Sequence, residues 1–158
     1  MELTDLITAL GERIGLKLVL DEAGACTLAV DGMSVVIQDV SEADSVGFWG
    51  RIGAPPPEGL ERLSVLMLEA NHLFQATAGA TISRDPESKD FFLCRVLDLR
   101  CLDAEAFISA LERFVNTLES WQRLVADYRP GGESGGTDDG AADGNPGGAG
   151  MDPEFIRI

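Results

Sequence analysis

The sequence predicts an α+β domain in which helices pack on a twisted, mostly antiparallel sheet, with the element order α-β-β-β-β-α-β-β-α. Two observations lead to this prediction. Apolar residues recur at helical spacing in three segments, over residues 3–14, 58–77 and 104–125. Between these segments, short runs alternate apolar with polar residues and are bounded by Gly, Pro and Asp. Strands that follow one another along the chain favour hairpins, and hence an antiparallel sheet.

The patterned part of the chain ends near residue 129. Beyond it the sequence is rich in Gly, Asp, Ser and Ala, and nine of the chain's 18 glycines lie between Gly131 and Gly150. We therefore expect one domain over residues 1–129 and a disordered tail over 130–158. Residues 151–158 begin Met-Asp-Pro-Glu-Phe, which common cloning sites encode, so they are either a remnant of cloning or a native apolar tip.

The charge of the chain restricts its partners. It carries 27 acidic and 12 basic residues, a formal net charge of −15. Such a surface repels nucleic-acid phosphates and anionic lipid, so we expect neither nucleic acid nor membrane as a partner. No leader-like segment or apolar run of membrane-spanning length is present, which favours a soluble cytoplasmic protein. Three cysteines without C-x-x-C spacing indicate neither a disulfide framework nor a zinc site.

The first helix is expected to end at Gly15 and to be followed by a three-stranded antiparallel meander over residues 16–38. Alternation of apolar and polar residues in 16–20, 26–30 and 33–37 predicts the three strands. Asp31-Gly32 is a strong hairpin signal, because a type I′ turn needs positive φ at both of its central residues. A fourth strand over 46–52 is expected to place Phe48 on one face and Trp49 on the other.

The helix over 58–77 carries apolar side chains on nearly all sides. Leu60, Leu63, Met67 and Phe74 share one stripe, and other apolar residues lie outside it. A surface helix of a small domain needs only one apolar face, so a helix that is apolar all round is buried on two sides. We therefore predict a homodimer whose interface contains Leu60, Leu63, Met67 and Phe74, with Trp49 nearby.

A second hairpin is expected to pair residues 80–84 with 91–99 across the turn Asp85-Pro86-Glu87-Ser88. Its second strand is apolar on both faces. Either part of one face is left open for a partner, or both faces are covered within the dimer. Asp103 is expected to cap the last amphipathic helix.

The sequence shows no catalytic constellation. His72, the chain's one histidine, lies on the apolar helix and is expected to be packed or at an interface. Ser64 and Ser83 have no partner base, and no aspartates have calcium-loop spacing. We therefore expect no enzyme, catalytic residue, metal or cofactor.

Over residues 1–128 the chain resembles the class I type III secretion chaperones, the CesT/Tir-chaperone family. The ordered motifs that carry the resemblance are Leu68-Glu69-Ala70-Asn71, Gly79-Ala80-Thr81-Ile82, Asp85-Pro86-Glu87-Ser88, Leu102-Asp103, Leu111-Glu112-Arg113-Phe114 and Trp121. Two features depart from the family pattern. Lys89-Asp90 replaces the usual Gly after the turn, and the tail is longer than such chaperones usually carry.

The resemblance implies a cytoplasmic homodimer that binds the N-terminal segment of a secreted effector, keeps it soluble and secretion-competent, and presents it to the export apparatus. The ATPase of that apparatus is a further implied partner. For effector contact we select Ile14, Leu16, Leu18 and Val36, on the first helix and the meander. The alternative is a regulatory protein of the same fold that sequesters a secretion-linked regulator or anti-activator.

Overall fold

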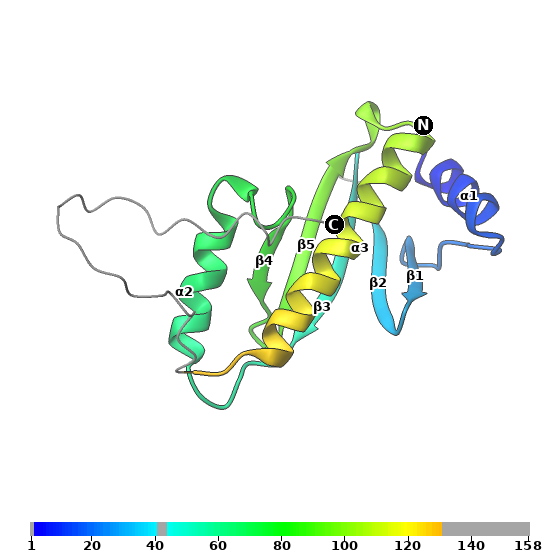
Figure 1. The fold of residues 1–158 in the computed structure, drawn as a ribbon. Helices are drawn as coiled ribbons and strands as arrows, with labels where there is room; N and C mark the ends of the chain where they lie inside the picture. The colour runs from blue at the N-terminus through cyan, green and yellow to red at the C-terminus, as the bar shows by residue number, and fades with distance from the viewer. Residues whose placement is uncertain (1, 41–43, 131–158) are drawn as a thin grey trace, which may run out of the picture.

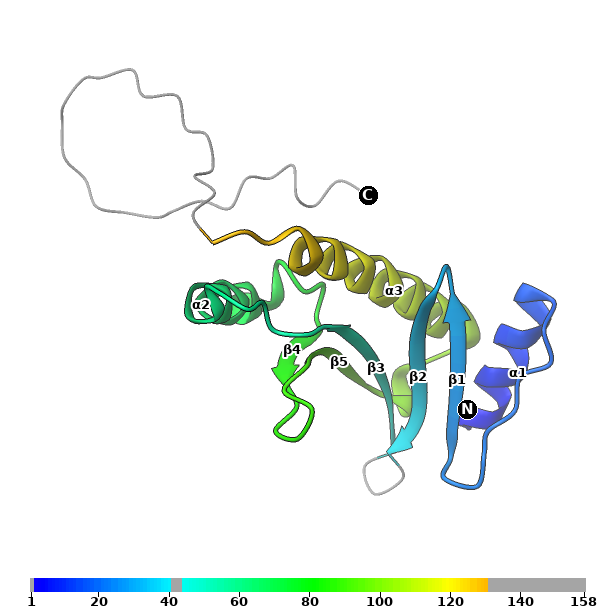
Figure 2. The same ribbon diagram turned by 90° about the horizontal axis from the view of Figure 1, so that it is seen from below.

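The computed structural model describes residues 2–40 and 44–130 and confirms an α+β fold (Figures 1 and 2). A five-stranded antiparallel sheet has the strand order β1-β2-β3-β5-β4. The long helix α3 crosses one face, α1 lies beside β1, and α2 lies beyond β4. The elements are α1 (Leu3–Ile14), β1 (Ala25–Val30), β2 (Met33–Val40), β3 (Ser45–Gly53), α2 (Leu60–Asn71), η2 (His72–Phe74), β4 (Thr81–Arg84), β5 (Phe91–Asp98), η3 (Leu99–Cys101) and α3 (Ala104–Asp127).

The expected disorder of 130–158 and the origin of 151–158 concern residues that, apart from Pro130, lie outside the described part of the chain.

The main core lies between α3 and the sheet. The ring of Phe48 on β3 packs edge-to-face against Phe107 and Phe114 of α3, with ring centroids 5.6 Å apart in each pair. A Cβ at Gly50 would lie 2.3 Å from Leu118, so this glycine allows the helix to approach the sheet. The Asp103 carboxylate accepts a 2.8 Å hydrogen bond from the amide of Ala106, which confirms the expected cap of α3.

The strand expected over residues 16–20 is not formed, so three strands precede α2 instead of four. Gly15 ends α1 with a φ of 71°, and the amide of Leu16 donates to the carbonyl of Gly11. The Asp21 carboxylate then accepts from the amides of Ala23 and Ala25, which turns the chain into β1. The apolar alternation of 16–20 therefore belongs to a connection that folds back on α1. The expected hairpin at Asp31-Gly32 is confirmed, with φ of 48° and 82° at its two residues.

The helix predicted over 58–77 extends only from Leu60 to Asn71. It ends where the backbone of His72 becomes extended, with a ψ of 122°. At its last residue, the Asn71 Nδ2 donates to the carbonyl of Ile82 on β4 and the Asn71 Oδ1 accepts from the amide of Ile82. A 3₁₀ turn follows, in which Leu73 and Phe74 have φ of 55° and 58°. The indole of Trp121 on α3 then donates a 3.0 Å hydrogen bond to the carbonyl of Ala76 and holds the connection to β4.

The second expected hairpin is confirmed by the pairing of β4 with β5. The Asp85 carboxylate organises its turn by accepting from the amides of Glu87 and Ser88 and from the Ser88 hydroxyl. These hydrogen bonds, with that of the Ser88 hydroxyl first, lower the pKa of Asp85. Lys89, which replaces the usual Gly, takes a φ of 66°, and the hairpin forms nonetheless.

Candidate functional site

Exposed apolar side chains, and not polar clusters, mark the candidate functional surfaces. One group lies at the end of α1 and just after it, and consists of Ile14, Leu16 and Val19, which we call the α1 surface. A second group lies on α2 and the turn after it, and consists of Val65, Leu68, Leu73 and Phe74, which we call the α2 surface. Val96 on β5 is also exposed. Large exposed apolar groups on a protein this acidic indicate contact with other proteins.

The α1 surface contains two of the four residues predicted to contact an effector. Ile14 and Leu16 are 46% and 58% exposed. A Cβ at Gly11 would lie 2.5 Å from the carbonyl oxygen of Leu16, so this glycine lets the segment fold against α1. The predicted Leu18 is half-buried and packs against the core. Val19 is 66% exposed. It was not among the predicted effector contacts, because in the expected strand its side chain would have pointed to the opposite face from Leu16 and Leu18.

The fourth predicted effector residue, Val36, lies elsewhere, on the sheet face opposite α3. The strand register pairs Val36 with Trp49 and Trp49 with Cys94, so these three side chains form a row on that face. A Cβ at Gly47 would lie 1.9 Å from the indole of Trp49, so the outer part of the ring occupies the space that a side chain at this glycine would need. Trp49 was predicted near the dimer interface. The structure places it beside Val36, and its position relative to a second copy stays a prediction.

The two edges of the sheet differ in availability. At the β4 edge, the Asn71 side chain occupies both the amide and the carbonyl of Ile82. At the β1 edge, Asp21 occupies the amide and the carbonyl of Ala25 at the start of the strand. No strand pairs with the outer side of β1 within the part of the chain that the structure describes. This edge lies next to α1 in both ribbon views (Figures 1 and 2). An unpaired strand edge offers backbone donors and acceptors to an extended peptide.

The predicted dimer stripe on α2 is largely buried within one protomer. Leu63 and Met67 are 0% and 3% exposed, and Leu60 is half-buried. Leu63 and Met67 therefore have no surface left for a second copy, which corrects their assignment. Sequence periodicity identified the apolar stripe but could not tell whether the protomer's own core or a second copy covers it. Phe74, at 52% exposure, remains accessible as part of the α2 surface.

Arg95 on β5 is an unusual charged residue beside the connection from α2 to β4. Its Nη1 is buried and lacks a hydrogen-bond partner among residues 2–40 and 44–130, as does the hydroxyl of Thr77. A Cβ at Gly79 would lie 3.6 Å from the Arg95 Cζ, so the guanidinium lies over this glycine. Burial, and then the positive charge of Arg113 on α3, lower the pKa of Arg95.

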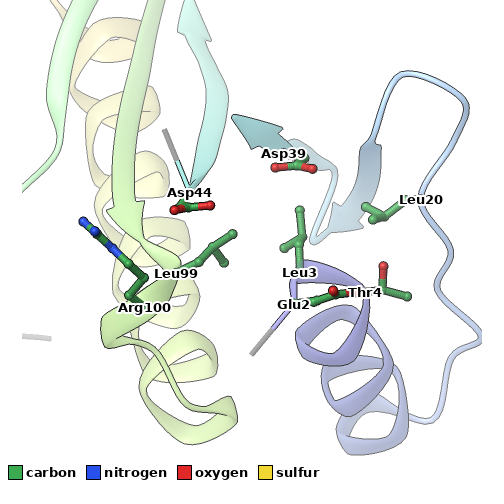
Figure 3. A pocket seen from close by; sticks show the side chains of 8 residues that line it. All are labelled: Glu2, Leu3, Thr4, Leu20, Asp39, Asp44, Leu99 and Arg100. Carbon is green, nitrogen blue, oxygen red and sulfur yellow. The ribbon is translucent and has the colours of Figure 1, made fainter. Parts of the chain in front are cut away.

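A polar cavity of about 470 Å³ lies between the start of α1 and the nearby ends of β2 and β5 (Figure 3). Glu2, Asp39, Asp44 and Arg100 are among the residues that line it, and the guanidinium of Arg100 points away from the other labelled side chains (Figure 3). That guanidinium is already paired with Asp98. Among the described residues, no group of three or more His, Cys, Asp or Glu could hold a metal ion. His72, expected to be packed or at an interface, is exposed in the protomer.

None of the helices in residues 2–40 and 44–130 is long and apolar enough to cross a membrane.

Solved structures with this fold include chains of several protein complexes. A chain of the ExsC–ExsE complex is 25% identical, with a TM-score of 0.66, and the match covers 79% of this chain and 97% of that one. A chain of the complex between the Yersinia pestis type III secretion chaperone SycH and a fragment of YscM2 is 15% identical, with a TM-score of 0.61 and coverage of 75% and 98%. A chain of the ExoT–SpcS complex from Pseudomonas aeruginosa is 21% identical, with a TM-score of 0.58 and coverage of 75% and 97%.

A sequence search among curated proteins gives no significant match. A family model does match, and it covers all five strands, α2 and most of α1 and α3. The matched residues are 5–122, and the model describes the Tir chaperone protein (CesT) family. The resemblance seen in the ordered motifs is thereby confirmed, and this chain belongs to the Tir chaperone protein (CesT) family.

Proposed function

We propose that this chain is a type III secretion chaperone. It binds the N-terminal segment of a secreted effector, keeps that segment soluble and secretion-competent, and presents it to the export apparatus and its ATPase. The observation that carries the proposal is the α1 surface beside the unpaired edge of β1, in a member of a chaperone family. The fold neighbours support it, since they include chains from a chaperone–effector complex, HopA1–SchA.

The effector segment binds as an added strand at the β1 edge. Its backbone pairs with β1, and alternate side chains contact Ile14, Leu16 and Val19. The β4 edge is a poorer choice, because Asn71 occupies the backbone groups of Ile82 within a strand of four residues, whereas Asp21 occupies only those of Ala25, the first residue of the six-residue β1. Val36 and Trp49 extend the apolar contact to the sheet face opposite α3. Binding an unfolded segment costs ordering entropy, so the contact area is large.

A second copy of the chain packs on the α2 surface. Val65 and Leu68 are 49% and 69% exposed, and Leu73 and Phe74 continue the apolar area beyond the end of the helix. A two-fold axis would bring the same surface of both copies together and cover these side chains from water. Homodimers of this kind present two effector-binding edges, so one long segment can contact both.

The acidic surface selects the effector segment by charge. With a formal net charge of −15, the chaperone attracts basic or neutral segments and repels acidic ones. This discrimination also keeps nucleic acid away from the apolar surfaces.

The test is capture of partners from the source cells by the full chain, followed by mass spectrometry and light scattering of the complex. We expect one secreted protein, held through its N-terminal region, on a homodimer. Leu16→Asp, which puts a charge on the α1 surface, should abolish capture, whereas Lys17→Asp, one residue along on the exposed connection, should have a much smaller effect.

Two outcomes would contradict the proposal. Capture of a small regulatory protein in place of a secreted one would favour the regulatory alternative. Equal loss of capture in the Leu16→Asp and Lys17→Asp variants would show that general acidity, and not the α1 surface, controls binding.

A further inference from the structure

The outer edge of β1 is closed at its start and open further along. The amide of Ala25 donates to the Asp21 carboxylate at 2.9 Å, and the carbonyl of Ala25 accepts from the amide of Asp21 at 2.8 Å. Asp21 therefore pairs with Ala25 as a neighbouring strand would. Within the described part of the chain, no group outside the sheet bonds the backbone of Thr27 or Ala29, and both residues are exposed.

The hairpin determines which backbone groups of β1 face outward. Val30 and Met33 flank its two-residue turn, so they exchange hydrogen bonds with each other. Pairs with and without hydrogen bonds alternate along antiparallel strands, so every second residue counted back from Val30 bonds β2. The residues between them, Thr27 and Ala29, direct both amide and carbonyl away from β2. Ala25 follows the same alternation, as its bonds to the preceding turn show independently.

We propose that Asp21 limits the added effector strand to two pairing positions, Thr27 and Ala29. This inference rests on the proposed function, and it specifies which segments fit the β1 edge. In an antiparallel arrangement, two residues of the segment, two positions apart, each donate from the amide and accept at the carbonyl. The residue between them makes no backbone hydrogen bond to β1. The edge therefore selects a short extended stretch with a donor at every second residue.

The same register places the side chains of the segment. Thr27 is paired with Val36, so it lies on the sheet face opposite α3. The two pairing residues of the segment project to this face, because cross-strand partners share a face. The residue between them projects to the other face, where Cys26 and Leu28 are buried. We therefore expect an apolar residue between the two donors.

The limit set by Asp21 has a physical consequence. An open strand edge pairs with any extended chain that reaches it, and a long edge promotes aggregation. Backbone hydrogen bonds at only two positions contribute little net binding free energy, because each replaces a hydrogen bond to water. Stable binding therefore also requires contact with the α1 surface. A segment must supply both features, which separates effector segments from other unfolded chains.

The first test uses the free chain and needs no effector. Amide hydrogen exchange, measured by NMR, should be fast at Thr27 and Ala29 and slower at Ala25. Asp21→Ala should speed exchange at Ala25 about tenfold, because the amide loses its acceptor. Asp21→Asn keeps an acceptor oxygen, and Glu22→Ala makes the same charge change next to it, so both should retain the slow exchange. Equal exchange rates at the three amides in the wild type would overturn the proposal.

The second test uses synthetic peptides that tile the N-terminal region of the secreted protein captured by the full chain. A proline scan of the binding peptide should find two sensitive positions, two residues apart, where proline removes a donor and raises the Kd about tenfold. Proline between them should have a much smaller effect. Exchange at Thr27 and Ala29 should slow in the complex. Asp21→Ala should add a third sensitive position, two residues beyond the others.

A wild-type scan with no sensitive pair, or with three or more alternating sensitive positions, would overturn the proposal. So would amides of Thr27 and Ala29 that exchange as fast in the complex as in the free chain. Failure of the chain to capture any secreted protein would instead count against the proposed function. Exchange in the free chain would still decide whether Asp21 closes Ala25 and leaves the rest of the edge open.

Discussion

The side chain of Asn71 pairs with the backbone of Ile82 as a neighbouring strand would. Its Nδ2 donates to the Ile82 carbonyl at 3.1 Å, and its Oδ1 accepts from the Ile82 amide at 2.8 Å. One residue at the end of α2 thereby attaches the helix to the sheet and closes the centre of the β4 edge. Asparagine carries a donor and an acceptor at the spacing this requires, whereas aspartate at neutral pH offers only acceptors.

Asn71→Ala should therefore destabilise the fold by about 1–3 kcal/mol, because it leaves the half-buried amide and carbonyl of Ile82 unpaired. The measurement is the free energy of unfolding in urea. Asn71→Asp should also destabilise, since a carboxylate cannot donate to the Ile82 carbonyl. Asn116→Ala on α3 is the control and should change the free energy little. Full stability of Asn71→Ala would show that α2 is held by its apolar face alone.

Gly47→Ala should displace the indole of Trp49. The new Cβ would lie 1.9 Å from the ring, so the ring must leave the open sheet face or the strand must shift. We expect a loss of about 1–3 kcal/mol, as for other overpacked positions, and longer-wavelength tryptophan emission as the ring enters water. Trp121 stays buried and contributes a constant signal.

Gly53→Ala is the matched control on the same strand. Its Cβ would lie 3.4 Å from Val125, close to ordinary contact distance, so both stability and emission should stay near those of the wild type. Identical emission from the two alanine variants would mean that Trp49 is not held against Gly47 in solution.

Adjacent substitutions on α2 should separate dimerisation from folding. Leu68 is 69% exposed, whereas Met67 is 3% exposed. Leu68→Asp should give a folded monomer, because the charge opposes contact between two α2 surfaces. Met67→Asp should instead cost about 3–5 kcal/mol of protomer stability, because it buries an unpaired charge. Sedimentation velocity and circular dichroism measure the two effects. A Leu68→Asp variant that stayed dimeric would remove α2 from the interface.

Asp98 should titrate at unusually low pH. Arg100 donates to its carboxylate from the side chain and from the backbone amide, and these hydrogen bonds lower the pKa of Asp98 to about 2. Because the folded pKa lies below the unfolded value of about 3.9, the contribution to stability is present above that value and is lost as the pH falls toward 2. Carboxyl NMR titration should show the low pKa in the wild type and a higher pKa in Arg100→Gln, still below about 3.9 because the backbone amide of residue 100 continues to donate to the carboxylate.

Arg129→Gln, at the other end of α3, serves as the control for this titration and should leave the pKa of Asp98 low. The stability advantage of the wild type over Arg100→Gln should also shrink between pH 4 and pH 2. An advantage that stayed constant across this range would contradict an origin in the Asp98 carboxylate.

Local patterns in the sequence predicted most elements of the fold. The positive-φ pair Asp31-Gly32, the turn at Asp85 and the cap at Asp103 each act through neighbouring residues, so their chemistry is visible in a short window. The strand expected over 16–20 does not form, and local residues on either side of it again explain why. Its alternation was real, but Gly15 and Asp21 direct the backbone away from the sheet. Of the residues predicted to contact an effector, Ile14 and Leu16 are exposed together, while Val36 lies on a different face.

The sequence by itself determined the α+β class, the antiparallel hairpins and the family, because these depend on periodicity, turn residues and the order of short motifs. The tertiary structure decided which apolar side chains stay exposed on the protomer. Leu63 and Met67 are buried in the protomer's own core, whereas Leu68, next to Met67, is exposed. It also decided that the guanidinium of Arg95 lies over Gly79, with its Nη1 buried and without a hydrogen-bond partner among the described residues. Burial and charge pairing depend on which elements meet in space, and sequence spacing carries no record of that.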